Sequence, residues 1–582
     1  MLQVICAGLL CLVLASCNTD KNMTLEENVL TIRLAGEPDN LNPTRSRSTY
    51  ATPIESLIMY PLAEYDPVSF ELSPLIVKSL ASTELIEEGP CTGGTRFTYE
   101  MREEAEWDDG TPVTGHDYAF TIKMSLNPRV DAATLRGFLS FIKDVEIDPN
   151  NPKKFTATVP EAYMLAEVIT CNFNIFPKHI YDPNGYMDHI TVAELADEQS
   201  SAQLAESDSS LQKFADAFAS VGFNRDTVSG CGPYTLVEWV TGEHIILERK
   251  KDWWGDKVKD APALMAAYPE RIDYRVIADE TMALSALKDG TIDFMAEVSP
   301  ANFLEMKADA QWAEILEFHS PAVMMYDYLE LNNRHPMLRD RKVRAALAHA
   351  IDYNAIMDAI NLGMAQRTVG PFHPDKEYYN DELVVPEYNI ERSRELLAQA
   401  GWEDTNQDGT VDKELEGQRS ELNLDIVVSQ RELGQQIALL VKESAAKAGI
   451  DIDIVTKDNS SWVQAVRKRE FEILPMRSRT SPAINDPYQT WHSESDVPGG
   501  SNRSGFRSAV ADSLIDMIRV AKSEEERNHF YMEFQETIHE EQPVIFLYVP
   551  LERMIVNRKF EMTPSSRRPG YFENLFKLRD QK

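Results

Sequence analysis

Oxygen-bearing side chains recur at alternate positions in one short segment around residue 408. The candidate cation ligands in it are Asp404, Asn406, Asp408 and Asp412. Calcium is bound through oxygen ligands at this spacing, and Gly409 stands at the sixth position, where a calcium loop turns sharply. The twelfth position is Leu415, whereas a calcium loop needs a bidentate Glu there. Two interpretations stay open: a structural calcium site, or a polar turn between a helix over 389–400 and the next strand.

Other reactive patterns are missing from the sequence. It has no GxSxG, GxxxxGK[ST], HExxH or GxGxxG segment, and no pair among its eleven histidines has metal-ligand spacing joined to a third ligand. His116, His179 and His189 are interpreted as solvated or capping residues. The ninety-four carboxylates are too many for one acid–base pair to stand out. This pattern favours a binding protein over an enzyme, and no cofactor is expected beyond the calcium considered above.

An apolar run opens the chain and ends at a cysteine. Residues 2–14 are almost wholly apolar, and the segment LASC closes the run at Cys17. Thirteen residues are too few to span a bilayer but suit the apolar core of a secretory signal. The small-small-Cys ending resembles the lipobox of bacterial lipoproteins. It predicts a signal over 1–16, a lipidated Cys17 and a polar tether over 17–28; the alternative is a buried N-terminal helix.

Bulk properties limit the remaining choices. A chain of 582 residues is too long for one core, so two large lobes or three smaller ones are expected. Its net charge of 58 − 94 = −36 argues against nucleic acid and anionic lipid as partners. No later apolar run reaches eighteen residues, so the mature chain is expected to be soluble apart from its lipid. Cys91, Cys171 and Cys231 allow at most one disulfide, with three possible pairings.

The elements that must position a site alternate between short β-rich runs and helices, which is an α/β pattern. Strands are predicted over 29–34, 97–101, 154–159, 234–239, 245–249, 271–277, 450–455 and 544–549. Helices are predicted over 340–360, 389–400 and 430–448. The polar segment 189–220 is expected to form a surface helical insertion with little core value. The buried strand at 544–549 comes late enough for the chain to return to its first lobe.

A series of segments, in order along residues 30–550, resembles the family 5 extracellular solute-binding proteins of ABC importers. They are 32–43 (IRLAGEPDNLNP), 97–102 (FTYEMR), 107–117 (WDDGTPVTGHD), 230–234 (GCGPY), 283–294 (ALSALKDGTIDF), 340–347 (DRKVRAAL), 396–402 (LLAQAGW), 486–488 (DPY) and 535–547 (QETIHEEQPVIFL). Each segment alone is weak, but their number and order make the resemblance specific. Most of them would hold turns and cores; Arg344 and Asp352 are expected to cap or brace their helix.

The resemblance implies a two-lobed periplasmic-binding-protein clamp of type II, or cluster C. This is an α/β fold with mixed sheets, helices on both sides and a discontinuous lobe I. Transferred to this chain, lobe I covers 29–298 and 543–582, and lobe II covers 299–542. The ligand would lie between the lobes and stabilise their closed arrangement.

The resemblance also implies where a ligand binds. Asp486 matches the position where peptide-binding relatives place the carboxylate for the ligand's α-amino group; the alternative is an Asp that caps the turn before Pro487. Further candidates for pocket walls and backbone donors are Tyr488, Trp491, Asn502 and Asn332. Some dipeptide-binding relatives carry a carboxylate-binding arginine where this chain has Gln435 and Gln436. That difference is compatible with longer peptides or with another solute.

The expected function is therefore that of a monomeric, lipid-anchored receptor on a bacterial membrane, periplasmic or at the cell surface. It would capture a short peptide or another small solute and deliver it to an ABC permease and ATPase complex, without catalysis. Other solutes bound by this fold are oligosaccharides, nickel chelates, haem and opines. A sensory lipoprotein without transport is a further alternative, and an enzyme is the third class.

Overall fold

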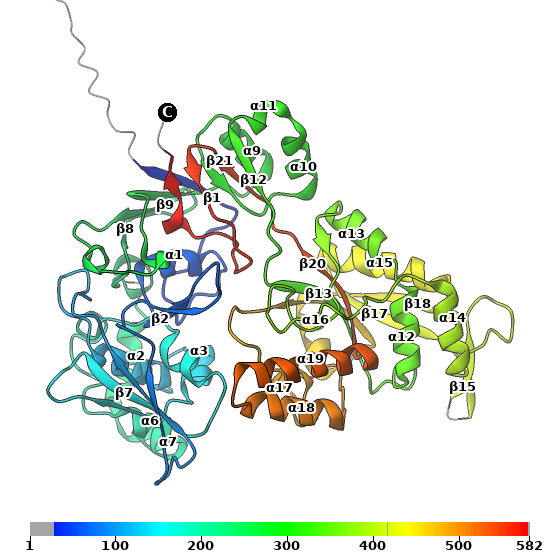
Figure 1. The fold of residues 1–582 in the computed structure, drawn as a ribbon, viewed down its shortest axis with the longest axis horizontal. Coiled ribbons are helices and arrows are strands. Elements are labelled where there is room, and N and C mark those ends of the chain that lie inside the picture. Colours follow the sequence, from blue (N-terminus) through cyan, green and yellow to red (C-terminus); the bar gives the residue numbers. More distant parts are fainter. Residues whose placement is uncertain (1–27, 221, 416, 580–582) are drawn as a thin grey trace, which may run out of the picture.

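The computed structural model describes residues 28–579 except 221 and 416 (Figure 1). Two large sheets form the centres of two lobes. The seven-stranded sheet of lobe I has the order β12-β21-β11-β1-β10-β9-β8, and the six-stranded sheet of lobe II has the order β14-β20-β13-β19-β17-β18. Cys17 and the predicted signal lie outside the described residues. No helix in the described part of the chain is both long and apolar enough to cross a membrane.

The lobe I sheet is built around two parallel strands. β1 (Val29–Leu34) pairs in register with β10 (Arg271–Val276), and β11 (Phe294–Met295) continues the sheet on its other side. The remaining strands are β8 (Tyr234–Val240), β9 (His244–Arg249), β12 (Leu316–His319) and β21 (Met554–Asn557). The strands predicted at 29–34, 234–239, 245–249 and 271–277 are therefore confirmed, with ends that differ by at most one residue.

The GCGPY segment is a point of close packing in lobe I. A side chain at Gly230 would place its Cβ 2.2 Å from the carbonyl oxygen of Ile58, in α1 (Ala51–Ile58). The indole nitrogens of Trp253 and Trp254 both donate to the carbonyl oxygen of Cys231, at 3.0 and 2.7 Å. These residues thus hold the core together, as expected for most of the family-like motifs.

A four-stranded sheet forms the far part of lobe I, with the order β4-β5-β7-β6. Its strands are β4 (Ser82–Leu85), β5 (Thr95–Glu100), β6 (Asp144–Ile147) and β7 (Lys154–Val159). It is followed by α6 (Val192–Ala196), α7 (Glu198–Ser207) and α8 (Ser209–Phe218). The expectation that 189–220 has little core value holds for α7, which buries no residue, but is wrong for α8. Phe214 and Phe218 in α8 are at most 1% exposed because they stack in an aromatic cluster of lobe I.

The lobe II sheet has helices on both faces. Its strands are β13 (Met325–Leu331), β14 (Ala365–Gln366), β17 (Asn423–Ser429), β18 (Asp451–Lys457), β19 (Ile473–Arg479) and β20 (Val544–Pro550). One face packs against α12 (Arg341–Ala350), α13 (Tyr353–Asn361), α14 (Ile390–Gln399) and α15 (Glu432–Ala446). The other face packs against α17 (Tyr488–Trp491), α18 (Ala509–Val520) and α19 (Glu524–Glu541), drawn in orange in Figure 1.

The predicted helix over 340–360 is two helices. Ile351 between α12 and α13 is extended, with φ −90° and ψ 125°, and the Asp352 carboxylate accepts a hydrogen bond from the Ala355 amide at 3.0 Å. The apolar spacing continues through the break, which is why periodicity alone missed it. Asp352 is thus a cap, as expected, and Arg344 braces α12 by donating to the carbonyl oxygens of Glu541 and Gln542.

The chain crosses between the lobes twice, and both crossings lie later than the predicted boundaries at 298/299 and 542/543. β12 belongs to the lobe I sheet, so the first crossing follows His319; β20 belongs to the lobe II sheet, so the return follows Pro550. An antiparallel bridge between Ala322 and Leu551 joins the two crossing segments. The predicted strand at 544–549 is fully buried as expected, but it is a central strand of lobe II because both of its edges are paired there.

Shorter elements complete the lobes. In lobe I they are β2 (Ala63–Tyr65), β3 (Leu72–Pro74), α2 (Gly115–Leu126), α3 (Ala133–Leu139), α4 (Ala166–Cys171), α5 (Lys178–Tyr181), α9 (Glu280–Lys288), α10 (Pro300–Ala308), α11 (Ala310–Ala313), β22 (Phe560–Glu561) and β23 (Lys577–Leu578). In lobe II they are β15 (Asp412–Leu415), β16 (Gln418–Glu421) and α16 (Asn459–Lys468). Cys91, Cys171 and Cys231 are all free thiols.

Candidate functional site

A pocket of about 380 Å³ lies in lobe II at the carboxyl end of β19. Its floor is one face of the sheet, with Tyr326, Tyr328 and Glu330 of β13 and Phe546 of β20. Its walls come from segments that follow strands or precede helices: Arg477, Ser478, Arg479, Thr480, Asn485, Asp486, Pro487, Thr490, Trp491, Arg503 and Ser504. Ligand sites in α/β folds commonly lie at the carboxyl ends of strands, because loops there can vary without disturbing the sheet.

Side chains alternate between the two faces of the sheet along β13, and this alternation determines which of them form the floor of the pocket. Leu329 and Leu331 face the α12–α15 side, while Tyr328 and Glu330 face the pocket. The Tyr328 hydroxyl donates to a Glu330 carboxylate oxygen at 3.2 Å. Burial raises the pKa of Glu330 to about 7, and the nearby Arg503 charge opposes that rise. The pocket therefore holds an acid that exchanges its proton near neutral pH.

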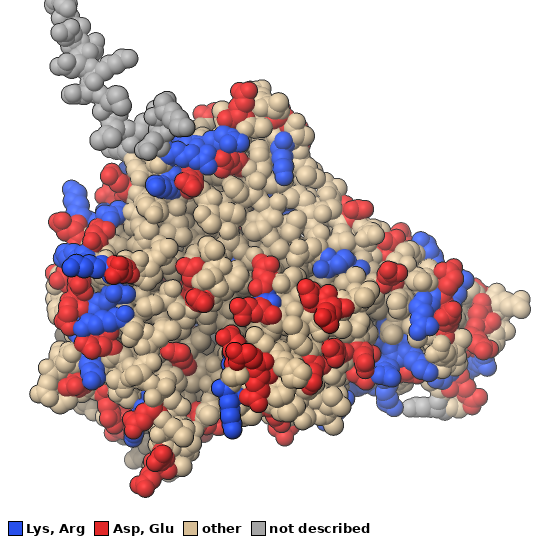
Figure 2. Space-filling model, viewed as in Figure 1, with Lys and Arg blue, Asp and Glu red and all other residues tan. Residues whose placement is uncertain are grey.

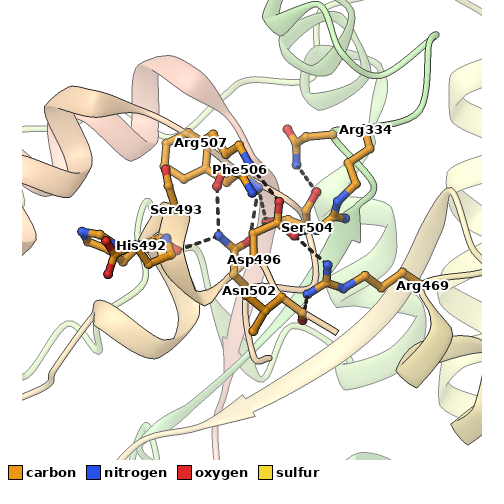
Figure 3. A network of polar contacts seen from close by, with 12 residues as sticks. Arg334, Arg469, His492, Ser493, Asp496, Asn502, Ser504, Phe506 and Arg507 are labelled. Atoms are coloured by element: carbon orange, nitrogen blue, oxygen red, sulfur yellow. Dashed lines mark hydrogen bonds and ion pairs between the residues drawn. The ribbon is translucent and has the colours of Figure 1, made fainter. Parts of the chain in front are cut away.

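A buried carboxylate holds the loop that supplies Arg503 and Ser504. Figure 3 shows Asp496 surrounded by Arg334, Arg469 and Arg507; its oxygens accept from Arg469 at 2.6 Å and from Arg507 at 2.9 Å, and from Arg334 as well. Burial alone would raise the pKa of Asp496, but hydrogen bonds and charges from the three arginines hold it below its usual range. Such a network of charge-assisted bonds fixes the loop against the sheet.

Asn502 and Asn332 lie beside this network, outside the pocket lining. Asn502 is fully buried, and its side-chain amide donates to the carbonyl oxygens of His492 and Phe506 at 3.1 and 2.9 Å (Figure 3). The Asn332 amide donates to the Phe471 carbonyl oxygen at 3.0 Å. Their side-chain oxygens accept from Ser504 and Arg334 respectively, so in this structure both asparagines shape the loop. Their roles toward a ligand stay predictions.

The structure brings Asp486 and Trp491 together in the pocket wall, with Tyr488 next to them. One Asp486 oxygen accepts from the Tyr488 amide at 3.0 Å, which is the turn-capping contact considered as the alternative. The other oxygen is 3.2 Å from Nε of Arg519. The Tyr488 hydroxyl donates to Glu494 at 2.6 Å, and Trp491 is 5% exposed. Asp486 therefore already has a cationic partner in this structure.

Lobe I touches lobe II at this corner. Tyr163, in the segment between β7 and α4, lies with its ring centre 5.4 Å from the Arg519 guanidinium, which also lies 4.5 Å from the Tyr488 ring. Burial, followed by the charge of Asp486 and a hydrogen bond to it, raises the pKa of Tyr163. Met164 packs against the apolar cluster of lobe II. The Tyr163–Arg519 corner is thus one contact between the lobes, remote in sequence from the two crossing segments.

A second contact between the lobes lies beside the crossing segments. The Met324 amide donates to the Ser566 carbonyl oxygen of lobe I at 2.8 Å, and the Met324 carbonyl accepts from the Thr480 amide of lobe II at 2.9 Å. The segment that follows Ser566 lines a lobe I pocket of about 70 Å³ together with Glu297 and Glu552, and an adjoining one of about 260 Å³ beside α1. No motif marks this segment in the sequence, because its residues meet the rest of the site only through the fold.

The acidic segment at 404–412 is a turn that ends in the β15–β16 hairpin. Asp404 accepts from the amides of Asp408 and Gly409 at 3.2 and 3.0 Å, and Asp412 accepts from the Thr405 amide at 3.0 Å and pairs with Arg419. No group of three or more His, Cys, Asp or Glu side chains that could hold a metal ion occurs in the described part of the chain. These contacts are those of a polar turn, the alternative to a calcium site.

Comparison with known proteins places the chain in a family. The profile of the bacterial extracellular solute-binding proteins, family 5 Middle, matches residues 82–499, more than two thirds of the chain. The chain belongs to this family. Family 5 members are solute-binding proteins, and the resemblance found in the sequence is confirmed.

Family 5 relatives match along most of the chain. The oligopeptide-binding protein AppA of Bacillus subtilis is 26% identical, over 91% of this chain and 88% of its own. The periplasmic oligopeptide-binding protein OppA of Salmonella typhimurium is 23% identical, over 79% and 77%. The solved AppA structure with a nonapeptide has a TM-score of 0.67 at 22% identity, covering 95% and 99%. NikA from Brucella suis with Fe(III)-EDTA reaches 0.73 at 19%, covering 95% and 100%. The predicted two-lobed fold is confirmed.

Proposed function

We propose that this family 5 protein is the solute receptor of an ABC importer and that it captures short peptides between its lobes. The observation that carries the proposal is the polar pocket at the carboxyl end of β19, which lies beside both contacts between the lobes. It is supported by the names of the relatives, since AppA and OppA are oligopeptide-binding proteins. The breadth of the family, which includes a nickel-binding and a haem-binding protein, defines the alternative solutes.

The pocket suits an extended peptide backbone. Its wall is the end of β19 followed by Thr480, Asn485 and Asp486, and the buried Thr480 hydroxyl, which has no hydrogen-bond partner within the described residues, can bond to a peptide backbone. The space of about 260 Å³ beside α1 in lobe I can take a side chain together with water. Such a site would fix the backbone while tolerating different side chains.

Closure would follow from the two crossing segments. Because the crossing segments 320–324 and 551–553 connect the two sheets, rotation there can change the distance between the lobes at the Tyr163–Arg519 corner without disturbing either core. A ligand that contacts both lobes stabilises the closed form by its differential affinity. The importer would recognise that form.

Asp486 would receive the α-amino group of the peptide. Its present partner is Arg519, so the ammonium group would have to replace or join the guanidinium at the same carboxylate. Trp491 and Tyr488 would flank the first residue, and Asn502 and Asn332 would act through the loop they hold. A lipid on Cys17 would keep the receptor, as a monomer, at the outer side of a bacterial membrane beside its permease.

Native mass spectrometry of residues 18–582, followed by denaturing release of bound molecules, tests the function. A ladder of masses that fit short peptides is the expected result. One non-peptide mass would keep the receptor and replace its solute. An empty protein whose melting temperature no peptide pool raises would refute the peptide proposal.

A further inference from the structure

Two arginines from opposite lobes stand in the two segments that hydrogen-bond to the backbone of Met324. Arg479 ends β19 in lobe II and pairs through its backbone with Met325, while Thr480 donates to Met324. Arg568 stands two residues after Ser566, which accepts from the Met324 amide. Arg479 lines the lobe II pocket and Arg568 lines both lobe I pockets. The backbone of one residue thus ties together the segments that carry both guanidinium groups.

These two side chains differ from the arginines around them. Arg477 forms a bidentate pair with Asp327, at 2.7 Å for both bonds, and Arg567 pairs with Glu64 at 2.9 Å. Within residues 28–579, leaving out 221 and 416, neither Arg479 nor Arg568 forms an ion pair or a side-chain hydrogen bond.

Acidic side chains are not scarce in this protein. The chain has ninety-four acidic and fifty-eight basic residues, and Figure 2 shows acidic side chains spread over both lobes. Glu297 and Glu552 line the same lobe I pocket as Arg568, but Glu552 accepts from the amides of Glu297 and Arg553, and Glu297 accepts from the Tyr50 hydroxyl. The arginine charges are therefore only partly balanced by the protein.

We propose that Arg479 and Arg568 together bind a carboxylate of the transported solute and so make closure of the lobes depend on that group. A guanidinium group matches a carboxylate in geometry, and two of them can each supply a charge-assisted hydrogen bond. Burial lowers the pKa of Arg568 and the Arg479 charge lowers it further, against the opposing charges of Glu552 and Glu297, as expected for two guanidinium groups that repel each other. Without an anion, that repulsion opposes closure; with one, each lobe holds the same ligand group.

This inference deepens the proposed function and rests on it. The carboxylate can come from the peptide C-terminus or from an Asp or Glu side chain. Both sources offer the same chemistry to the arginines. Three synthetic pools of tri- to pentapeptides separate them: free C-termini without Asp or Glu, amidated C-termini with Asp or Glu, and amidated C-termini without acidic residues.

The experiment measures retention of each pool by native mass spectrometry and its affinity by isothermal titration. The parent protein should bind at least one acid-bearing pool about tenfold more tightly than the acid-free pool. Arg479→Gln and Arg568→Gln should each reduce this preference, and the double variant should abolish it while still binding the acid-free pool. Arg96→Gln, on β5 and 3.9 Å from Glu84, removes one charge of lobe I far from the cleft and should leave the preference unchanged.

Equal binding of all three pools by the parent would overturn the inference and leave the peptide receptor in place. An unchanged preference in the double variant, with its melting temperature also unchanged, would overturn it as well. If either single variant unfolds, Arg568→Lys and Arg479→Lys keep the charge and should retain most of the preference. Binding of none of the pools by the parent would refute the proposed function and this inference together.

Discussion

The Tyr163–Arg519 corner gives a direct test of closure, because Tyr163 reaches Arg519 of lobe II from lobe I. Replacing Tyr163 by Ala removes a ring 5.4 Å from the Arg519 guanidinium and a hydroxyl bonded to Asp486. A cation–π contact at a partly exposed site contributes about 0.5–1 kcal/mol. A hydrogen bond contributes about 0.5–1.5 kcal/mol. The closed form should therefore lose roughly 1–2.5 kcal/mol relative to the open form.

This loss should appear as weaker ligand binding, by about 5- to 70-fold. Isothermal titration with the peptide that dominates the native mass spectrum gives the affinity, and stopped-flow kinetics should assign the change mostly to dissociation. Tyr163→Phe keeps the ring and loses only the hydroxyl, so its effect should be smaller. Small-angle scattering of both ligand-free proteins measures the balance of open and closed forms. Unchanged affinity and scattering for Tyr163→Ala would show that this corner does not stabilise closure.

Three further outcomes are expected. Asp486→Asn should weaken binding of peptides with a free α-amino group about tenfold and leave N-acetylated peptides unaffected; unchanged affinity for both, by isothermal titration, would leave Asp486 only its turn-capping contact. A calcium site at 404–412 requires calcium to raise the melting temperature of the parent but not of Asp408→Ala, and an equal response of both refutes it. Burial raises the pKa of Glu573 from its ordinary value of 4.5 to about 7. The folded protein therefore binds this proton more tightly than the unfolded chain does, and the free energy of unfolding should fall as the pH rises from 4.5 to about 7. Glu573→Gln should flatten this part of the curve in urea unfolding, whereas an unchanged slope would assign the proton to another group.

Strands bounded by polar turns could be predicted from the sequence, whereas continuous apolar periodicity gave a wrong prediction of helix length. β1 and β7 have the predicted bounds because alternate residues enter a core and turn residues end each run. The segment 340–360 has helical spacing throughout, yet one extended residue and the Asp352 cap divide it. In α8 the polar composition concealed two phenylalanines that only the fold brings into a core. Local pattern determines the element type, whereas breaks and burial depend on neighbours distant in sequence.

The cleft was less predictable than the fold because its residues are joined by tertiary contacts. Asp486, Tyr488 and Trp491 share one short segment, so a family-like motif could indicate all three. Arg479 and Arg568 are 89 residues apart in sequence (568 − 479), and Met324 is hydrogen-bonded to the segments that carry them. Neither arginine stands in a motif, and in sequence each resembles a solvated surface charge. A clamp must bind one ligand from two lobes, so residues that couple binding to closure have to come from separate parts of the chain.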